Sequence, residues 1–167
     1  MLATLTIASA LAGPAPSTWA GGSFAVQRQF LREPRDDWAW SAGAIGVRGG
    51  VARVIGRAYV GKATQGTYLS VLLGGGLRTP GNRHDPYLLV DLHAGYSAVW
   101  GSYGGPTGRV SAGVGVPWRS GPKPRPPTGA VQVVVFGEGV SVIDGLYEGE
   151  NKGQIGVAVD VLRYVKR

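Results

Sequence analysis

The sequence predicts an all-β protein, an antiparallel up-and-down β-barrel of about eight strands that spans a membrane. Three observations lead to this fold class. Apolar residues alternate with small or polar residues in successive runs, turn-forming segments separate the runs, and no stretch after residue 20 has the apolar spacing of a helix. Closing such a meander into a barrel removes the edges that an open sheet would expose.

The composition narrows the class further. Glycine accounts for 29 of the 167 residues, and charged residues make up only 16% of the chain. A water-soluble sheet protein normally covers its outer face with charged side chains, which are scarce here. Because the chain has no cysteine, disulfides and thiolate metal sites are excluded. The net charge of +7 is compatible with an anionic membrane surface or nucleic acid as a partner, and the charge alone does not decide between them.

The clearest strand is the run from Tyr87 to Trp100. Successive side chains leave a strand on opposite faces, so the run divides into two sets. One set is mostly small, polar or ionisable: Leu89, Asp91, His93, Gly95 and Ser97. The other is apolar: Leu88, Val90, Leu92, Ala94, Tyr96, Ala98 and Trp100. We expect the apolar face to lie against lipid and the other face to line the barrel interior.

The same alternation predicts seven further strands. They are expected at residues 23–31, 38–48, 51–62, 67–78, 109–118, 130–144 and 154–165. Gly49-Gly50 is expected to form a two-residue hairpin turn, since glycine takes positive φ without steric cost. Gly137 and Gly139 could interrupt the strand at 130–144. The proline-rich, basic segment 119–129 is expected to be extended and to lie outside the sheet.

Residues 1–20 are interpreted as a signal peptide or an N-terminal extension that precedes a barrel domain at residues 21–167. Their apolar run is too short to cross a bilayer as a helix. Ala10-Leu11-Ala12 and Thr18-Trp19-Ala20 both have the small-x-Ala pattern of a signal-peptidase site. The alternative is that the segment is retained as a strand or plug.

The predicted interior face carries charges of both signs. Buried charges must be paired or neutralised, so we expect an ion-pair network in an interior that side chains fill. Its members are Arg53, Arg57, Asp91, Arg109 and Asp160, with Glu138 as a further acid.

Aromatic residues gather near the predicted strand ends. Tyr and Trp favour the boundary between hydrocarbon and water, where their rings are buried and their polar atoms stay wet. The expected membrane-interface residues are Trp38, Trp40, Trp100, Trp118 and Tyr164.

This pattern resembles that of the small outer-membrane β-barrels of the OmpA/OmpX type. The resemblance covers about residues 23–165. It rests on the two-residue alternation in Trp38–Arg48, Thr67–Leu77, Tyr87–Trp100, Arg109–Trp118 and Gln154–Val165. It implies a barrel inserted in the outer membrane of a diderm bacterium.

One constellation has catalytic residue types. Asp91, His93 and Ser97 share a strand face, and a carboxylate that orients a His, which in turn activates a Ser, makes an acyl-transfer site. Lipid A palmitoyltransferases and lipid A deacylases are small barrels that do acyl chemistry with Ser and His, although the deacylases place their His and Ser two residues apart on a strand. The alternative, which the sequence favours, is that Asp91 and His93 belong to the interior network and pair with Arg53 or Arg57.

No metal site and no cofactor are predicted. His84 and Asp85 share a turn with Asn82, but two liganding side chains are too few for a zinc site. The acidic segment with Asp144, Glu148 and Glu150 is interpreted as a solvated loop.

The expected partners are membrane lipid or lipopolysaccharide and, through the loops, another protein. Nucleic acid is not expected, because the basic segment 119–129 has only Trp118 beside it for base stacking.

The sequence therefore predicts an outer-membrane barrel with a structural or surface-interaction role and no enzymatic activity. The first alternative is a secreted or periplasmic soluble barrel that binds an apolar ligand inside or an anionic polymer outside. The second is a barrel-embedded lipid A-modifying acyl hydrolase or transferase that uses His93. The first alternative requires apolar strand faces that point inward.

Overall fold

The computed structural model describes residues 17–30, 37–80, 84–119 and 127–165 of the chain. Within these ranges the secondary structure is all β, with nine strands. The strands are β1 (Ser17–Phe30), β2 (Asp37–Gly49), β3 (Ala52–Ala63), β4 (Gly66–Arg78), β5 (Tyr87–Val99), β6 (Tyr103–Trp118), β7 (Gly129–Ser141), β8 (Asp144–Gly145) and β9 (Asn151–Tyr164). No helix in the described part is long and apolar enough to cross a membrane.

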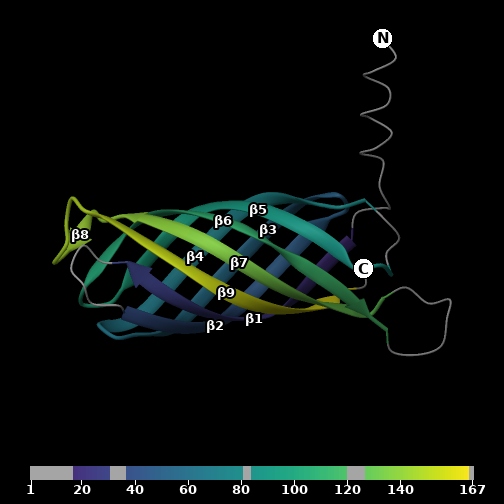
Figure 1. Ribbon diagram of the computed structural model, residues 1–167, viewed down its shortest axis with the longest axis horizontal. Helices are drawn as coiled ribbons and strands as arrows, with labels where there is room; N and C mark the ends of the chain where they lie inside the picture. The colour runs from purple at the N-terminus through teal and green to yellow at the C-terminus, as the bar shows by residue number, and fades with distance from the viewer. Residues whose placement is uncertain (1–16, 31–36, 81–83, 120–126, 166–167) are drawn as a thin grey trace, which may run out of the picture.

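Eight of these strands close into an antiparallel up-and-down barrel (Figure 1). Each strand pairs with its neighbours in sequence, except that β7 pairs with β9 across the short β8. Pairing of β1 with β9 closes the ring. The two-residue β8 pairs with the start of β6, along the same edge of β6 that β7 pairs with farther on. The predicted fold class, an up-and-down barrel of about eight strands, is confirmed.

The two ends of the barrel differ in their connections. At the end where β1 begins and β9 finishes, here called the terminal end, β2 joins β3 through residues 50–51, β4 joins β5 through residues 79–86 and β6 joins β7 through residues 119–128. At the opposite, distal end, β3 joins β4 through residues 64–65 and β5 joins β6 through residues 100–102. The segment with β8 also lies at the distal end (Figure 1).

Some strand boundaries differ from those expected. β1 begins at Ser17 rather than residue 23, because Thr18 and Trp19 pair with Arg48 and Val47 of β2. Thr18-Trp19-Ala20, one of the two candidate cleavage sites, therefore lies within a strand.

β6 begins at Tyr103, where glycines and a proline conceal the alternation in the sequence. β7 continues through Gly137 and Gly139 and ends at Ser141, because both residues stay paired with β9 and Asp144 belongs to β8.

The barrel is polar inside and apolar outside. On β5, Asp91 and His93 point inward and are buried, whereas Leu88 and Leu92 point outward and are 58% and 61% exposed. The same alternation runs along the other barrel strands. The interior polar residues include Ser23, Gln27, Gln29, Ser41, Arg53, Arg57, Ser70, Asp91, His93, Ser97, Arg109, Ser111, Gln132, Glu138, Lys152, Gln154 and Asp160.

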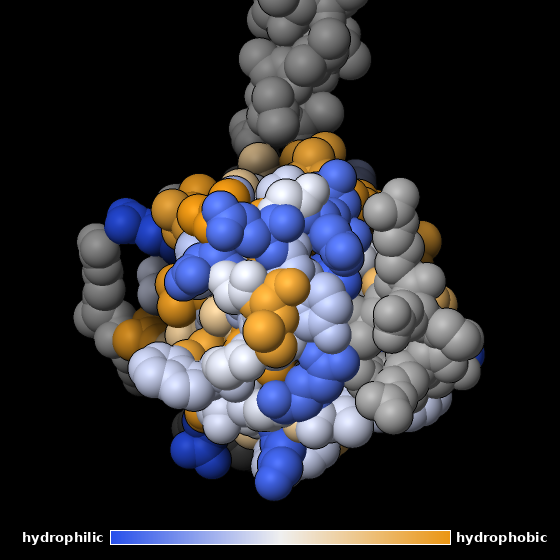
Figure 2. Space-filling view, turned by 90° about the vertical axis from the view of Figure 1, so that its left-hand side faces the viewer, coloured by the Kyte–Doolittle hydropathy of each residue, from blue (hydrophilic) through white to orange (hydrophobic). Residues whose placement is uncertain are grey.

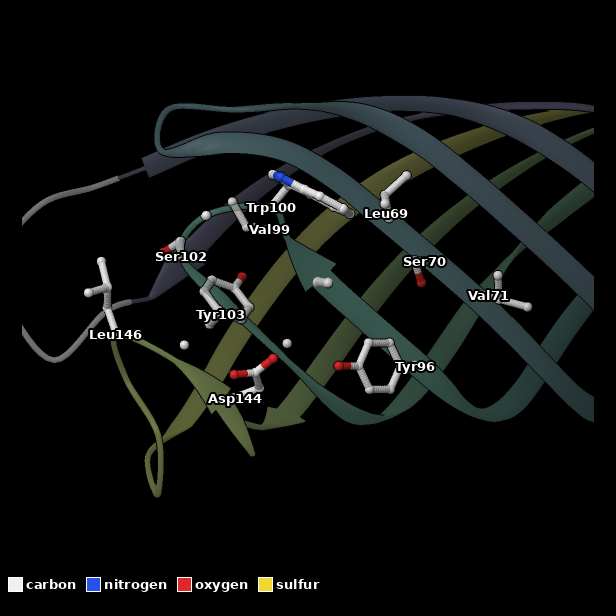
Figure 3. Close-up of a pocket in the computed structure, with 14 residues that line it drawn as sticks. Leu69, Ser70, Val71, Tyr96, Val99, Trp100, Ser102, Tyr103, Asp144 and Leu146 are labelled. Carbon is white, nitrogen blue, oxygen red and sulfur yellow. The ribbon is translucent and has the colours of Figure 1, made fainter.

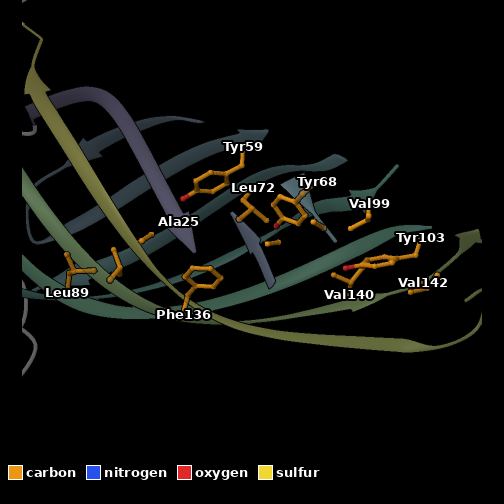
Figure 4. Close-up of a cluster of buried hydrophobic side chains, with 14 residues drawn as sticks. Ala25, Tyr59, Tyr68, Leu72, Leu89, Val99, Tyr103, Phe136, Val140 and Val142 are labelled. Atoms are coloured by element: carbon orange, nitrogen blue, oxygen red, sulfur yellow. The ribbon is translucent and has the colours of Figure 1, made fainter. Parts of the chain in front are cut away.

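Two buried apolar clusters complete the interior. One contains Ile45, Val47, Ile55 and Leu162, with Trp19 packed against it, near the terminal end. The other extends to the distal end and includes Tyr68, Leu72, Val99, Tyr103, Phe136, Val140 and Val142 (Figure 4). Viewed onto the distal end, hydrophobic residues lie near the centre among hydrophilic ones (Figure 2). Polar and apolar side chains together fill the barrel, as expected for eight strands.

Glycines that face inward allow the backbone of a neighbouring strand to approach closely. Gly43 lies opposite Tyr59, and Gly61 lies opposite Tyr68. A Cβ at Gly43 would collide with the backbone of Ala58 on β3, whereas a Cβ at the outward-facing Gly46 would meet no atom. The abundant glycine of the sequence is therefore partly a consequence of a narrow, filled interior.

We predict that Gly43→Ala lowers the free energy of unfolding by about 1–3 kcal/mol, because the new methyl group overpacks the interior and displaces β3. Gly46→Ala on the same strand is the matched control and should change it by no more than about 0.5 kcal/mol. Urea unfolding followed by tryptophan fluorescence measures both. Equal losses in the two variants would contradict the account of the inward glycines.

Candidate functional site

The interior holds three ion pairs between arginines and acids. Arg53 contacts Asp91 at 2.7 Å, Arg57 contacts Asp160 at 2.8 Å, and Arg109 contacts Glu138 at 2.6 Å. In each pair both side chains are at most 3% exposed. The sequence singled out these interior charges, and the structure arranges them as three separate pairs.

The Arg53–Asp91 pair spans three strands. Arg53 on β3 and Asp91 on β5 lie opposite the same residue of the intervening β4, Gly76. A Cβ at Gly76 would collide with the Asp91 carboxylate, so glycine leaves the space in which the two charges meet. The guanidinium donates from Nη2 to both carboxylate oxygens, at 2.7 Å each, and from Nε to Oδ1 at 3.0 Å.

The Arg57–Asp160 pair crosses the interior from β3 to β9. Two hydrogen bonds join the guanidinium to the carboxylate, from Nη1 at 2.9 Å and from Nη2 at 2.8 Å. Ser23 donates to the same carboxylate at 2.6 Å and contacts the Tyr59 hydroxyl at 3.0 Å. Arg57 also donates to that hydroxyl at 2.8 Å. The charge pair is therefore part of a closed ring of polar contacts, which compensates for its desolvation.

Glu138 is the centre of the third group. Arg109 Nε donates to it at 2.7 Å, and the Ser97 hydroxyl donates to its other oxygen at 2.7 Å. Thr107 and Tyr68 contact the same oxygen at 3.1 and 3.3 Å.

The arginine of this group also stacks on aromatic rings. The Arg109 guanidinium lies 3.9 Å from the ring centroid of Phe136 and 5.1 Å from that of Tyr59. These contacts fix a charged side chain in a space without bulk water.

The candidate relay of Asp91, His93 and Ser97 does not form. The Asp91 carboxylate is bound by Arg53, and the Ser97 hydroxyl contacts Glu138 and, at 2.8 Å, Ser70. Neither ring nitrogen of His93 has a hydrogen-bond partner among the described residues. The three side chains thus share a strand face but lack the contacts by which a His would activate a Ser.

The expected interface aromatics lie at both rims. Trp38, Trp40 and Trp100 are exposed on the outer wall towards the distal end, where Trp40 stacks on Phe24 with centroids 6.5 Å apart. Trp118 is at the terminal end and is half-buried.

Tyr164, by contrast, follows the interior-facing register of β9 at the terminal rim. Its ring contacts that of Trp19 edge-on, with centroids 5.4 Å apart. Trp19 was missed in the sequence, because it fell within the segment interpreted as a leader.

The acidic segment at the distal end contains an ion pair that the sequence did not reveal. Lys152 points inward and contacts Glu150 at 2.7 Å, and its ammonium group lies 3.7 Å from the ring centroid of Tyr147. His84 and Asp85 lie in the turn between β4 and β5, and Asn82 is outside the described residues. The described residues contain no group of three or more His, Asp or Glu that could hold a metal ion.

Comparison with protein-family models, with curated proteins and with solved structures finds no match for this chain.

We predict that Asp160→Asn and Arg57→Met each lower the free energy of unfolding by about 3–5 kcal/mol, because each leaves a buried charge without its partner. The double variant should lose less than the sum of the two, since it removes both charges. Urea unfolding of the four proteins gives this coupling. Glu150→Gln, which removes an acid from a partly exposed pair, should cost less than either single variant. Strictly additive losses for Arg57 and Asp160 would contradict the assigned pair.

Proposed function

We propose that this chain is an outer-membrane β-barrel of a diderm bacterium, with a structural or surface-interaction role carried by its connecting segments and no enzymatic activity. The observation that carries the proposal is the arrangement of its two faces: an ion-paired polar interior and an apolar outer wall. This arrangement supports the interpretation of the chain as a small outer-membrane barrel of the OmpA/OmpX type.

The outer wall supports a lipid environment. Large apolar side chains are exposed on all eight barrel strands, among them Val26, Trp40, Val60, Leu73, Val90, Val114, Val135 and Val157. Removing apolar surface from water is favourable by about 25 cal/mol per Å². Acyl chains around the barrel would remove this surface from water. The barrel strands have 12 to 16 residues, and a tilted membrane-spanning strand needs about 9–11.

The rims support the same placement. Trp38, Trp40 and Trp100 at the distal end would lie at the headgroup level, where amphipathic rings are most stable. At the terminal end, Arg48 and Arg163 point outward and are exposed. Their long side chains can reach anionic headgroups while their stems cover the apolar wall. Anionic phospholipid or lipopolysaccharide is therefore the expected lipid partner.

The alternatives have less support. A soluble barrel that binds an apolar ligand would need an apolar, open interior, and here the interior is charged and filled. A lipid A-modifying hydrolase or transferase would need an activated nucleophile, and His93 does not contact Ser97.

We predict that the protein stays with the outer-membrane fraction after carbonate washing and migrates differently on SDS gels before and after heating. Leu92→Arg should abolish both behaviours, because a charge on the lipid face near the middle of a strand costs about 2–4 kcal/mol. Thr64→Arg, in the exposed turn between β3 and β4, is the matched control and should leave both unchanged. Release of the wild type by carbonate as a monomer, with Leu92→Arg equally well folded, would overturn the proposal.

Export is part of the proposal, and the structure bears on the choice of cleavage site. Cleavage after Ala12 would leave β1 whole, whereas cleavage after Ala20 would remove its first four residues. The lost residues would include Trp19, which packs on the terminal apolar cluster. We therefore predict processing after Ala12, which the intact mass of the protein from the outer membrane would reveal. A mass that corresponds to a start at Gly21 would contradict this choice.

A further inference from the structure

A groove lies on the outer wall at the distal end of the barrel. It has a volume of about 650 Å³ and runs over β4 and β5 to the segment that contains β8 (Figure 3). Its lining is largely apolar and includes Leu69, Tyr96, Ala98, Trp100 and Leu146. The exposed side chains of its lining, such as Leu69, Tyr96 and Trp100, belong to the outer wall.

Small residues form the floor of the groove. In the sheet register, Leu69 of β4 pairs with Ala98 of β5, and Ala98 pairs with Gly104 of β6. A Cβ at Gly104 would lie 2.6 Å from the Tyr96 hydroxyl, so a side chain there would displace that ring. The larger side chains of Leu69, Tyr96 and Trp100 form the sides of the groove around these small residues.

The short strand β8 completes the groove and brings a charge to it. Gly104 pairs with Asp144 of β8, and the Leu146 amide donates to the Ser102 carbonyl at 2.8 Å. Gly145 has a φ of 103°, which a side chain would oppose, and this conformation turns the segment along the wall. Figure 3 shows the Asp144 carboxylate near the Tyr96 hydroxyl, with Leu146 farther along the segment.

Among the residues that line the groove, Asp144 carries the one carboxylate, and none is a Lys, Arg or His. Within the described residues, Asp144 takes part in no ion pair. An apolar groove with a lone carboxylate at one side is complementary to a molecule that carries an aliphatic chain and a cationic group.

We infer that this groove binds a bilayer phospholipid whose headgroup carries a primary ammonium, of the phosphatidylethanolamine class. An acyl chain lies along Ala98 and Gly104 between the aromatic walls, and the ammonium donates to the Asp144 carboxylate. The inference rests on the membrane placement proposed above, because the groove opens on the wall that faces lipid. A primary ammonium is preferred to a quaternary one, which has no N–H to donate.

Native mass spectrometry of the protein tests this inference. The folded protein is taken from single-chain detergent into equal amounts of phosphatidylethanolamine, phosphatidylcholine and phosphatidylglycerol, and the lipids retained on the barrel are counted. We expect phosphatidylethanolamine to be retained preferentially. Asp144→Asn should weaken this retention by about tenfold, the factor that corresponds to the loss of one charge-assisted hydrogen bond.

A second pair of variants separates the groove from general lipid contact. Ala98→Leu fills the floor and should reduce retention, whereas Ala94→Leu, outward on the same strand but outside the groove, should not. Equal retention of the three lipids, or retention unchanged in both Asp144→Asn and Ala98→Leu, would overturn the inference.

The proposal that the barrel is inserted in a membrane is tested separately from the proposal that the groove binds lipid. If the wild type shows no heat-modifiable migration and is released by carbonate, it is not inserted in the membrane, whatever lipid it retains. An inserted barrel with no lipid preference would refute the groove alone.

Discussion

A barrel of eight strands has an interior just wide enough for side chains, so every charge inside it must find its partner there. The rest of this structure follows from that constraint. Inward glycines such as Gly43 and Gly76 leave space that the backbone of β3 and the Asp91 carboxylate occupy. Hydroxyl groups form further hydrogen bonds with the paired charges, and aromatic rings stack on the Arg109 guanidinium. The result is a solid, internally neutralised core, and the apolar half of each strand is left to face outward.

The function proposed for this molecule resides on its surface. The interior residues with catalytic chemistry are committed to structure: Asp91 binds Arg53, and Ser97 binds Glu138. The outer wall, by contrast, offers continuous apolar area, aromatic rims and a groove with one carboxylate, Asp144. A rigid core allows these outer features to be held in fixed positions without any contribution from the interior to binding.

Much of the fold could be predicted from the sequence because a period of two is hard to mistake over a dozen residues, as in Tyr87–Trp100. Charges of both signs on one face likewise indicated ion pairs. The partners could not be assigned, since Arg57 and Asp160 are brought together only by closure of the ring. The groove could not be predicted either, because it depends on the register of Gly104 with β8, a strand of two residues that has no periodicity.

The interior pairs also have a consequence for how the strands find their alignment. Arg57 and Asp160 come from β3 and β9, so their contact exists only when β1 has joined β9 in the correct register. A slip of one residue would turn Asp160 onto the apolar outer face and leave Arg57 buried without an acid. Misaligned closure therefore costs free energy in two places, on the apolar outer wall and in the core. The ion pair therefore favours the correct strand register over registers shifted by one residue, and it stabilises the barrel once the ring is closed.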